Sequence, residues 1–222
     1  MSCLDTLLCM IRSVVFDIGE TIARDDRYWN SWADWINVPR HTLSALVGSV
    51  VAQGLDNAEA LRLLRPGIDI AAEYRAREAA GCGEELDETD LYEDVRPALS
   101  ALRQLGIRVI IAGNQTARVG RLLRELDLPA HLIATSQEWG VAKPRLEFFA
   151  QVLEAAQAEP GETLYVGDHP ANDVFPAKEA GLLAAHLRRG PWGHLWAGDP
   201  EVIAAADWQI GTLTELAEVV AG

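Results

Sequence analysis

Cysteine is scarce in this sequence, and long hydrophobic runs are absent. The three cysteines, Cys3, Cys9 and Cys82, form no CxxC pair, and their odd number argues against a disulfide framework. A reducing, cytoplasmic location is therefore expected. No apolar run approaches the roughly 18 residues that a membrane-spanning helix requires. The first residues, MSCLDTLLCMIR, include Asp5 and lack a basic stretch, so we do not expect a signal peptide.

Positive charge is also scarce. The chain has 19 basic and 33 acidic residues, for a net charge of -14. Such a surface repels nucleic-acid backbones and anionic membranes, so we expect neither as a partner. The same charge opposes small anionic substrates, and a phosphate-binding site would need a cation or a local cluster of hydrogen-bond donors.

Low-complexity tracts are missing too, which excludes a disordered or fibrous chain. The length of 222 residues allows one sizeable core, or one core with a smaller appended domain. From about residue 92 onward, short β-branched runs alternate with helical stretches, which is typical of a parallel sheet with crossover helices. We predict strands at 13–17, 108–113, 131–136, 163–168, 182–187 and 207–211, and helices at about 95–105, 116–126, 145–157, 171–180 and 212–220.

Residues 25–91 differ from the rest of the chain. They contain four helical patterns with little β-branched alternation, which predicts an all-helical insert after the first strand. Trp29, Trp32 and Trp35 recur every three residues there; they could line a pocket, but packing within the insert is the favoured interpretation. The expected fold is therefore α/β, with a Rossmann-like, doubly wound, mostly parallel core (1–24 and 92–222) and an inserted helical cap (25–91).

Chemically useful side chains follow four of the predicted strands. In open α/β sheets, ligands bind at the carboxyl ends of the strands, and these ends deliver Asp17, then Gly113 and Asn114, then Lys143, then Asp168 and Asp173. Any single aspartate here could be a helix cap. Together, two carboxylates and a lysine at one sheet edge suit a hard cation beside a nucleophile. Lys143 is one of only two lysines in an arginine-rich chain, which indicates a need for a compact point charge.

Four stretches, VVFDIGET, IIAGN, VAKP and YVGDHPAND, resemble in order and spacing the motifs of the haloacid dehalogenase-like hydrolase superfamily. The resemblance covers nearly the whole chain, and the helical insert is similar to the cap that closes over the active site in that family. It implies a Mg²⁺-dependent enzyme that acts on a small-molecule substrate. It also implies that the enzyme is a monomer or a homodimer. Mg²⁺ takes oxygen ligands and offsets the repulsion between a carboxylate and a phosphate.

The resemblance also implies a role for each matching residue. Asp17 corresponds to the nucleophile that forms an aspartyl-phosphate, and Lys143 to the cation that holds nucleophile and phosphate together. Thr21 corresponds to a threonine that orients the nucleophile. Phosphate contacts would come from Gly113, Asn114 and Lys143, and metal contacts from Asp17, the Gly19 carbonyl, Asp168 and Asp173, the last as a ligand or as a partner of one.

The sequence departs from the family pattern at two places. Gly19 stands where phosphatases of the family carry a second aspartate that donates a proton, and such acid–base help is commonly worth about 10² to 10⁴-fold. The adjacent Glu20 is a poor substitute, because neighbours on an extended segment point to opposite sides. Gly113 replaces the usual serine or threonine, although its backbone N–H and the Asn114 amide could still bind an anion.

Three functions stay open at this point. The favoured one is a phosphatase or phosphoryl-transfer enzyme acting on a small phosphorylated metabolite. The second is carbon-centred hydrolysis like that of 2-haloacid dehalogenases, which need no metal and would use a cap arginine such as Arg24, Arg27 or Arg40; Asp168 weighs against it. The third is a catalytically impaired metabolite-binding protein. A phosphonate-cleaving relative needs a cap lysine, and residues 1–142 contain none.

Overall fold

The computed structural model describes residues 10–221, so Cys3, Cys9 and the predicted absence of a signal peptide lie outside the described residues. Its centre is one six-stranded sheet in the order β3-β2-β1-β4-β5-β6, with every pairing parallel. Each strand is found within one residue of its predicted bounds, which confirms the α/β Rossmann-like fold. The strands are β1 (Ser13–Phe16), β2 (Arg108–Gly113), β3 (Leu132–Thr135), β4 (Thr163–Gly167), β5 (Leu183–Leu187) and β6 (Trp208–Ile210).

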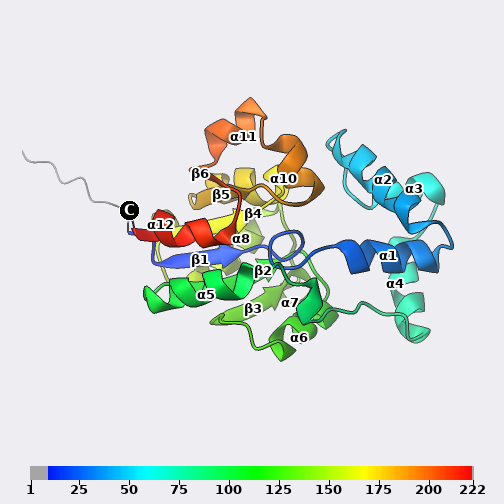
Figure 1. The fold of residues 1–222 in the computed structure, drawn as a ribbon, viewed down its shortest axis with the longest axis horizontal. Coiled ribbons are helices and arrows are strands. Elements are labelled where there is room, and N and C mark those ends of the chain that lie inside the picture. The colour runs from blue at the N-terminus through cyan, green and yellow to red at the C-terminus, as the bar shows by residue number, and fades with distance from the viewer. Residues whose placement is uncertain (1–9, 222) are drawn as a thin grey trace, which may run out of the picture.

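Helices cover both faces of the sheet (Figure 1). Because side chains alternate along a strand, Val14 and Phe16 enter one hydrophobic cluster and Val15 enters the other. The first cluster is completed by α5 (Val95–Gln104), α6 (Ala117–Glu125) and α12 (Leu216–Ala221). The second is completed by α8 (Leu146–Ala156) and α9 (Phe175–Glu179). Burial on both faces explains why these strands read as continuous apolar runs.

The order of the strands reverses between β1 and β4. Phe16 is level with Ile111 on one side and with Val166 on the other, so the carboxyl ends of these central strands lie side by side. The crevice at such a reversal is where open α/β sheets bind ligands. The fold therefore delivers Asp17 and Asp168 to the same place.

Several short helices were not predicted. They are α7 (Ser136–Trp139), α10 (Gly190–Trp196) and α11 (Pro200–Ala205). Glycine and proline in "GPWGHLW" lower its intrinsic helix propensity, and the burial of Trp192 provides packing that the local sequence does not reveal. The predicted helix at 171–180 begins as a π-helical turn, Pro170–Val174, before α9.

The insert is helical, as predicted, and contains α1 (Asp26–Trp35), α2 (Arg40–Val51), α3 (Glu59–Leu64) and α4 (Ile70–Ala79). These helices stand beside the end of the sheet (Figure 1) and share a third hydrophobic cluster. Trp32 is completely buried in it, which fits the packing interpretation, whereas Trp29 and Trp35 are half-buried. Trp192 of α10 joins the same cluster, so the insert packs on the core through α10.

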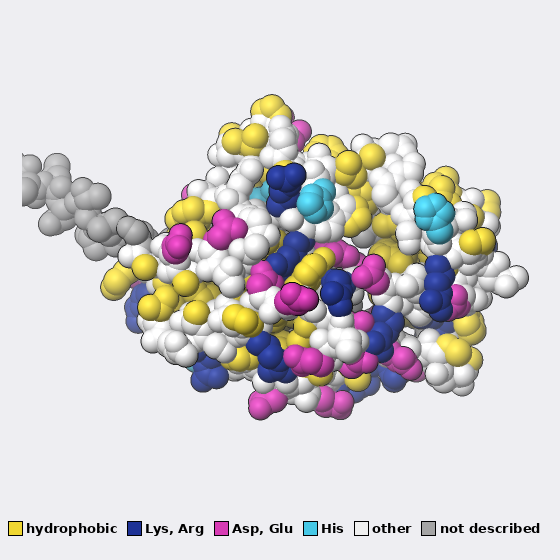
Figure 2. Space-filling view, viewed as in Figure 1, with side chains coloured by type: hydrophobic (Ala, Val, Ile, Leu, Met, Phe, Trp, Pro, Cys, Tyr) yellow, Lys and Arg dark blue, Asp and Glu magenta, His cyan; other side chains and the backbone are white. Residues whose placement is uncertain are grey.

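The molecular surface mixes charges of both signs. On the face shown in Figure 2, acidic and basic side chains lie next to one another, and the described ion pairs include Arg96 with Glu88 and Arg27 with Asp87. Cys82 is an exposed free thiol. None of the helices in residues 10–221 has the length and hydrophobicity that a bilayer-spanning segment needs.

Candidate active site

A cavity of about 640 Å³ lies between the strand ends and the helical insert. Its floor contains Asp17, directly after β1, Asp168, directly after β4, and Lys143, in the loop between α7 and α8. Its opposite wall comes from the insert and includes Tyr28 and Trp29. The structure thus brings three predicted site residues, Asp17, Lys143 and Asp168, into one space under the insert.

Lys143 joins two carboxylates. Its buried Nζ donates hydrogen bonds to Asp17 Oδ1 at 2.5 Å and to Asp173 Oδ1 at 2.6 Å. Burial raises the pKa of Asp17 to about 6, although Lys143 opposes this shift. Burial alone would lower the pKa of Lys143, but Asp17 and Asp173 raise it well above its ordinary value. The two carboxylates therefore favour the charged ammonium group, which fixes the direction of the Asp17 carboxylate.

Asp173 is positioned by the backbone around it. Its Oδ2 accepts a hydrogen bond from the His169 N–H at 2.9 Å, while Oδ1 is held by Lys143. A Cβ atom at position 167 would lie only 2.2 Å from Asp173 Oδ2, so Gly167 makes room for this carboxylate. With both oxygens engaged, Asp173 acts here as the residue that positions Lys143.

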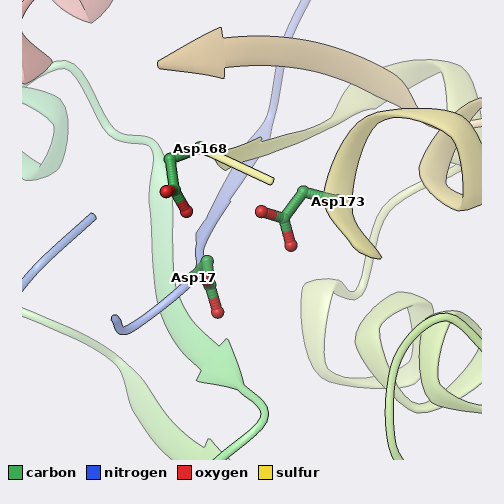
Figure 3. A group of neighbouring side chains, drawn as sticks. All are labelled: Asp17, Asp168 and Asp173. Atoms are coloured by element: carbon green, nitrogen blue, oxygen red, sulfur yellow. The ribbon is translucent and has the colours of Figure 1, made fainter. Parts of the chain in front are cut away.

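Asp168 has no comparable partner. It is 4% exposed, and no donor in residues 10–221 bonds its carboxylate. Burial raises its pKa well above the ordinary value, and Asp173 and Asp17 raise it further. Figure 3 shows Asp17, Asp168 and Asp173 converging from three segments, and one oxygen of each lies within 4.8 Å of the others. A buried group of carboxylates with an uncompensated member fits a hard divalent cation such as Mg²⁺.

The predicted phosphate-binding residues line or adjoin this floor. A Cβ atom at position 113 would lie 2.3 Å from Asp17 Oδ1, so Gly113 gives the Asp17 carboxylate the space that a serine would take. Asn114 lines the cavity, and its amide is already used: Nδ2 donates to the Lys143 carbonyl at 3.0 Å, and Oδ1 accepts from the Lys143 N–H at 2.8 Å. Asn114 therefore positions the lysine loop, and its contact with phosphate stays a prediction.

Thr21 and Gly19 belong to the tight turn after β1. Thr21 is buried, and its hydroxyl has no hydrogen-bond partner among the described residues, so its predicted orienting role is not exercised through a hydrogen bond here. Gly19 lines the cavity, and the metal contact of its carbonyl remains a prediction.

The sequence did not single out Asp25. A Cβ atom at position 19 would lie 3.2 Å from Asp25 Oδ1, so this carboxyl group occupies the space beside Gly19 that a longer residue would enter. Asp25 stands at the N-cap of α1, yet its side chain accepts no capping hydrogen bond, and it lines the cavity. Burial raises its pKa well above the ordinary value, as do Glu20 and Asp17. The only local signal was an aspartate at a helix start, which ordinarily indicates a cap.

Glu20 supports this arrangement. Its backbone is left-handed (φ 51°), which turns the side chain back so that Oε1 accepts the Asp25 N–H at 3.0 Å and Oε2 accepts the Tyr92 hydroxyl. The extended geometry assumed for this segment is therefore wrong at Glu20. A Cβ atom at position 190 would lie 2.6 Å from Glu20 Cγ, so the start of α10 packs directly on it.

Comparisons with known proteins identify the family of this chain. The family model of haloacid dehalogenase-like hydrolases matches residues 11–181. The chain is 31% identical over 210 residues to a phosphoserine phosphatase of Thermus thermophilus, covering 89% of this chain and 81% of that protein. It is 30% identical over 132 residues to a glyceraldehyde 3-phosphate phosphatase of Methanocaldococcus jannaschii, covering 58% of this chain and 56% of that protein. The chain thus spans about half the length of the archaeal relative.

The fold is also shared with a solved structure. The putative HAD-hydrolase YfnB of Bacillus subtilis, bound to magnesium, has a TM-score of 0.66 at 20% identity, covering 95% of this chain and 99% of that one. The family model spans most of the chain. This chain therefore belongs to the haloacid dehalogenase-like hydrolases and is an enzyme of that family.

Proposed function

We propose that this enzyme is a Mg²⁺-dependent phosphatase that hydrolyses a small phosphate monoester through an aspartyl-phosphate on Asp17. The observation that carries the proposal is the pairing of Asp17 with Lys143 at 2.5 Å beside the uncompensated carboxylate of Asp168. A nucleophile, a fixed cation and a cation-binding acid are what phosphoryl transfer needs. The phosphatases named among the relatives support the same reaction class.

Each site residue has a separate role in the proposed hydrolysis. Asp17 attacks phosphorus, the bond to the alcohol oxygen breaks, and water later cleaves the aspartyl-phosphate to release phosphate. Lys143 stabilises the charge on Asp17 and on the phosphoryl group. Mg²⁺, held by Asp17 and Asp168, would offset the negative charge that accumulates on the phosphoryl oxygens. Asp173 keeps Lys143 in place through the 2.6 Å hydrogen bond.

Asp25 is the candidate for the missing acid–base function. The alcohol oxygen needs a proton as it leaves, and the attacking water must lose one. Position 19 cannot supply either step, but the Asp25 carboxyl group lies against it, 3.2 Å from where a Cβ would start. We assign both proton transfers to Asp25, with Glu20 holding its backbone.

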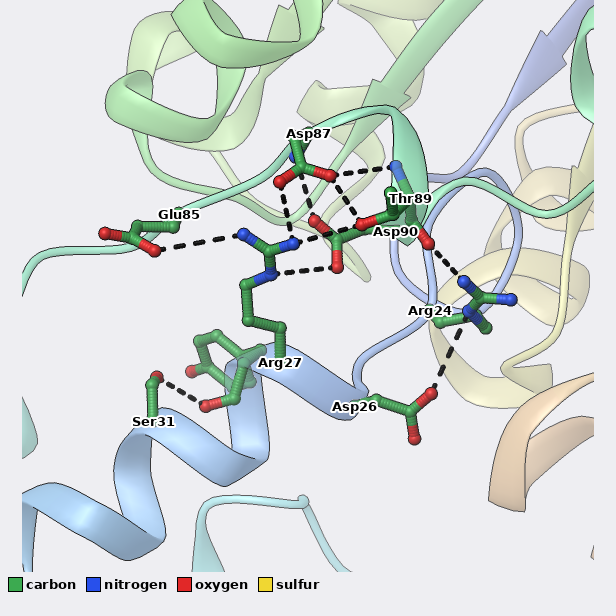
Figure 4. Close-up of polar contacts among 9 residues, drawn as sticks. Arg24, Asp26, Arg27, Ser31, Glu85, Asp87, Thr89 and Asp90 are labelled. Atoms are coloured by element: carbon green, nitrogen blue, oxygen red, sulfur yellow. Dashed lines mark hydrogen bonds and ion pairs between the residues drawn. The ribbon is translucent and has the colours of Figure 1, made fainter.

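The dehalogenase alternative is less well supported. The arginines it would need for halide, Arg24, Arg27 and Arg40, do not line the main cavity. Arg40 instead pairs with Asp34 at 2.7 Å, and Arg24 and Arg27 bond the segment that returns from the insert (Figure 4). Carbon-centred hydrolysis also gives no reason for burying Asp168 next to Asp17.

The test is release of inorganic phosphate from a panel of phosphate monoesters, with and without Mg²⁺, beside halide release from 2-haloacids. We expect Mg²⁺-dependent phosphate release that Asp17→Asn abolishes. Asp34→Asn, the same change on the exposed side of α1, is the matched control and should retain activity. Halide release would instead favour the dehalogenase, and silence in both assays with retained Mg²⁺ binding would favour a metabolite-binding protein.

A further inference from the structure

The cavity is acidic beyond the reacting carboxylates. In addition to Asp17 and Asp168, its lining includes Glu20, Asp25, Asp26 and Asp56. Among the described lining residues, Lys143 is the only lysine or arginine, and its ammonium group is already bonded to two carboxylates. The part of a substrate that extends away from the phosphate therefore meets negative charge with no free cation to pair with.

Aromatic side chains form the other part of the lining. Tyr28 and Trp29 come from α1 and contact each other edge to face, with ring centroids 4.9 Å apart. On the core side, Trp192 stacks on His169 at 3.7 Å between centroids. The indole N–H of Trp192 donates a hydrogen bond to Asn57 Oδ1 at 2.8 Å. This bond joins α10 to the insert and holds the Trp192 ring in place.

Size and charge together select a substrate class. The volume of about 640 Å³ is in the range of roughly 300 to 1,000 Å³ that holds ring-bearing ligands, and aromatic walls favour flat apolar groups. A second anionic group would face these acids with no free lysine or arginine among the described lining residues, and like charges repel. Carboxylate-bearing phosphate esters are therefore disfavoured by the same lining that favours neutral rings.

We propose, on the basis of the phosphatase function above, that the substrate is the phosphate monoester of a ring-bearing alcohol that carries no second anionic group. Asp56 is the acid best placed to enforce this choice. It is an exposed residue of the insert that lines the cavity, and no ion pair found in residues 10–221 includes it. Its Oδ1 accepts a hydrogen bond from the Ala58 N–H at 2.8 Å.

The first experiment compares matched esters in the presence of Mg²⁺. Benzyl phosphate and 4-carboxybenzyl phosphate differ by one carboxylate, and ethyl phosphate keeps an alkyl leaving group while removing the ring. We expect kcat/KM for benzyl phosphate to exceed that for each of the others at least tenfold. Equal or higher kcat/KM for 4-carboxybenzyl phosphate would overturn the charge selection, and equal kcat/KM for ethyl phosphate would overturn the ring selection.

A charge-reversal variant connects the selection to Asp56. Asp56→Lys should raise kcat/KM for 4-carboxybenzyl phosphate about tenfold relative to benzyl phosphate. Glu125→Lys, which makes the same charge change at an exposed position outside the cavity, is the matched control and should leave the ratio unchanged. A similar change of the ratio in both variants would assign the effect to net charge and contradict the proposed role of the cavity.

Binding separates this proposal from the phosphatase function. Calorimetric titration with benzylphosphonate and 4-carboxybenzylphosphonate needs no turnover, so it gives an answer even if no ester is hydrolysed. At least tenfold tighter binding of the neutral phosphonate supports the substrate class. Equal or tighter binding of the carboxylated compound rejects it, whether or not the chain proves to be a phosphatase.

Discussion

Gly113 and Gly167 leave space for the carboxylates of two aspartates. Side chains at these positions would collide with Asp17 Oδ1 at 2.3 Å and with Asp173 Oδ2 at 2.2 Å, respectively. The departure from the family pattern at position 113 is thus coupled to the placement of the nucleophile. Gly19 follows the same logic more loosely, because the Asp25 carboxyl group lies 3.2 Å from its missing Cβ.

Replacing Asp25 should reveal its role as a proton donor. We expect Asp25→Asn to lower kcat/KM for benzyl phosphate by about 10² to 10⁴-fold, the usual worth of acid–base assistance. The loss should be much smaller for 2,4-dinitrophenyl phosphate, since its leaving group needs no proton. Steady-state kinetics on the two esters measures this difference.

Moving the carboxyl group provides the complementary test. Gly19→Asp in an Asp25→Ala background has room for a side chain, because the shortened residue 25 vacates the space beside position 19, and it should recover part of the lost kcat/KM on benzyl phosphate. Asp34→Asn, on the far side of α1, is the control. An equal loss on both esters, without recovery, would show that Asp25 has a structural role only.

Arg27 at the start of α1 connects the beginning and the end of the insert. It reaches the returning segment, where it pairs with Asp87 at 2.8 Å, Asp90 at 3.0 Å and Glu85 at 3.8 Å (Figure 4). Hydrogen bonds from Thr89 and then from Arg27 lower the pKa of Asp87 to about 2. One arginine therefore ties together the two chain segments that lead into and out of the insert.

Arg27→Ala should loosen these two segments. We expect faster amide hydrogen exchange in residues 84–92 and a higher KM, because the wall carrying Tyr28 and Trp29 is then less well positioned. The free energy of unfolding should fall by only about 1 kcal/mol, since the pairs are partly exposed. Arg62→Ala, which removes an exposed pair with Glu59 within α3, is the control. Unchanged exchange and KM in Arg27→Ala would contradict a role of Arg27 in holding these two segments together.

Elements with a strong local pattern were predictable from the sequence. The six strands are hydrophobic runs, and Asp17, Lys143 and Asp168 could be assigned to one site because parallel strands end at one sheet edge. By contrast, α10 is rich in glycine and held by the burial of Trp192, and Asp25 acquires its position only when the turn through Glu20 folds back. Both depend on contacts between distant segments, which no local pattern encodes.

The stability of the whole molecule, which carries a net charge of -14, depends on how its buried carboxylates are neutralised. Asp17 has a pKa of about 6, and Asp168 one well above its ordinary value, chiefly because of burial. Carboxylates whose folded-state pKa exceeds the unfolded value stabilise the fold when protonated, and this contribution is lost as pH rises. Without metal, this site should therefore favour folding at pH 5 more than at pH 8.

Mg²⁺ should reverse that loss. A ligand at about 100 times its Kd adds about 2.7 kcal/mol to the free energy of unfolding, which corresponds to roughly 5 to 10 °C in Tm for a chain of this size. We expect the Tm increase caused by Mg²⁺ to be larger at pH 8 than at pH 5, because protons compete for the same carboxylates at low pH. Differential scanning calorimetry at both pH values, with NaCl at matched ionic strength as the control, measures this difference in Tm.

Asp168→Asn should abolish the Tm increase caused by Mg²⁺ and raise the Tm of the metal-free protein at pH 8, since it removes a buried, uncompensated charge. A Tm increase that persists in Asp168→Asn, or that is larger at pH 5, would place the cation elsewhere.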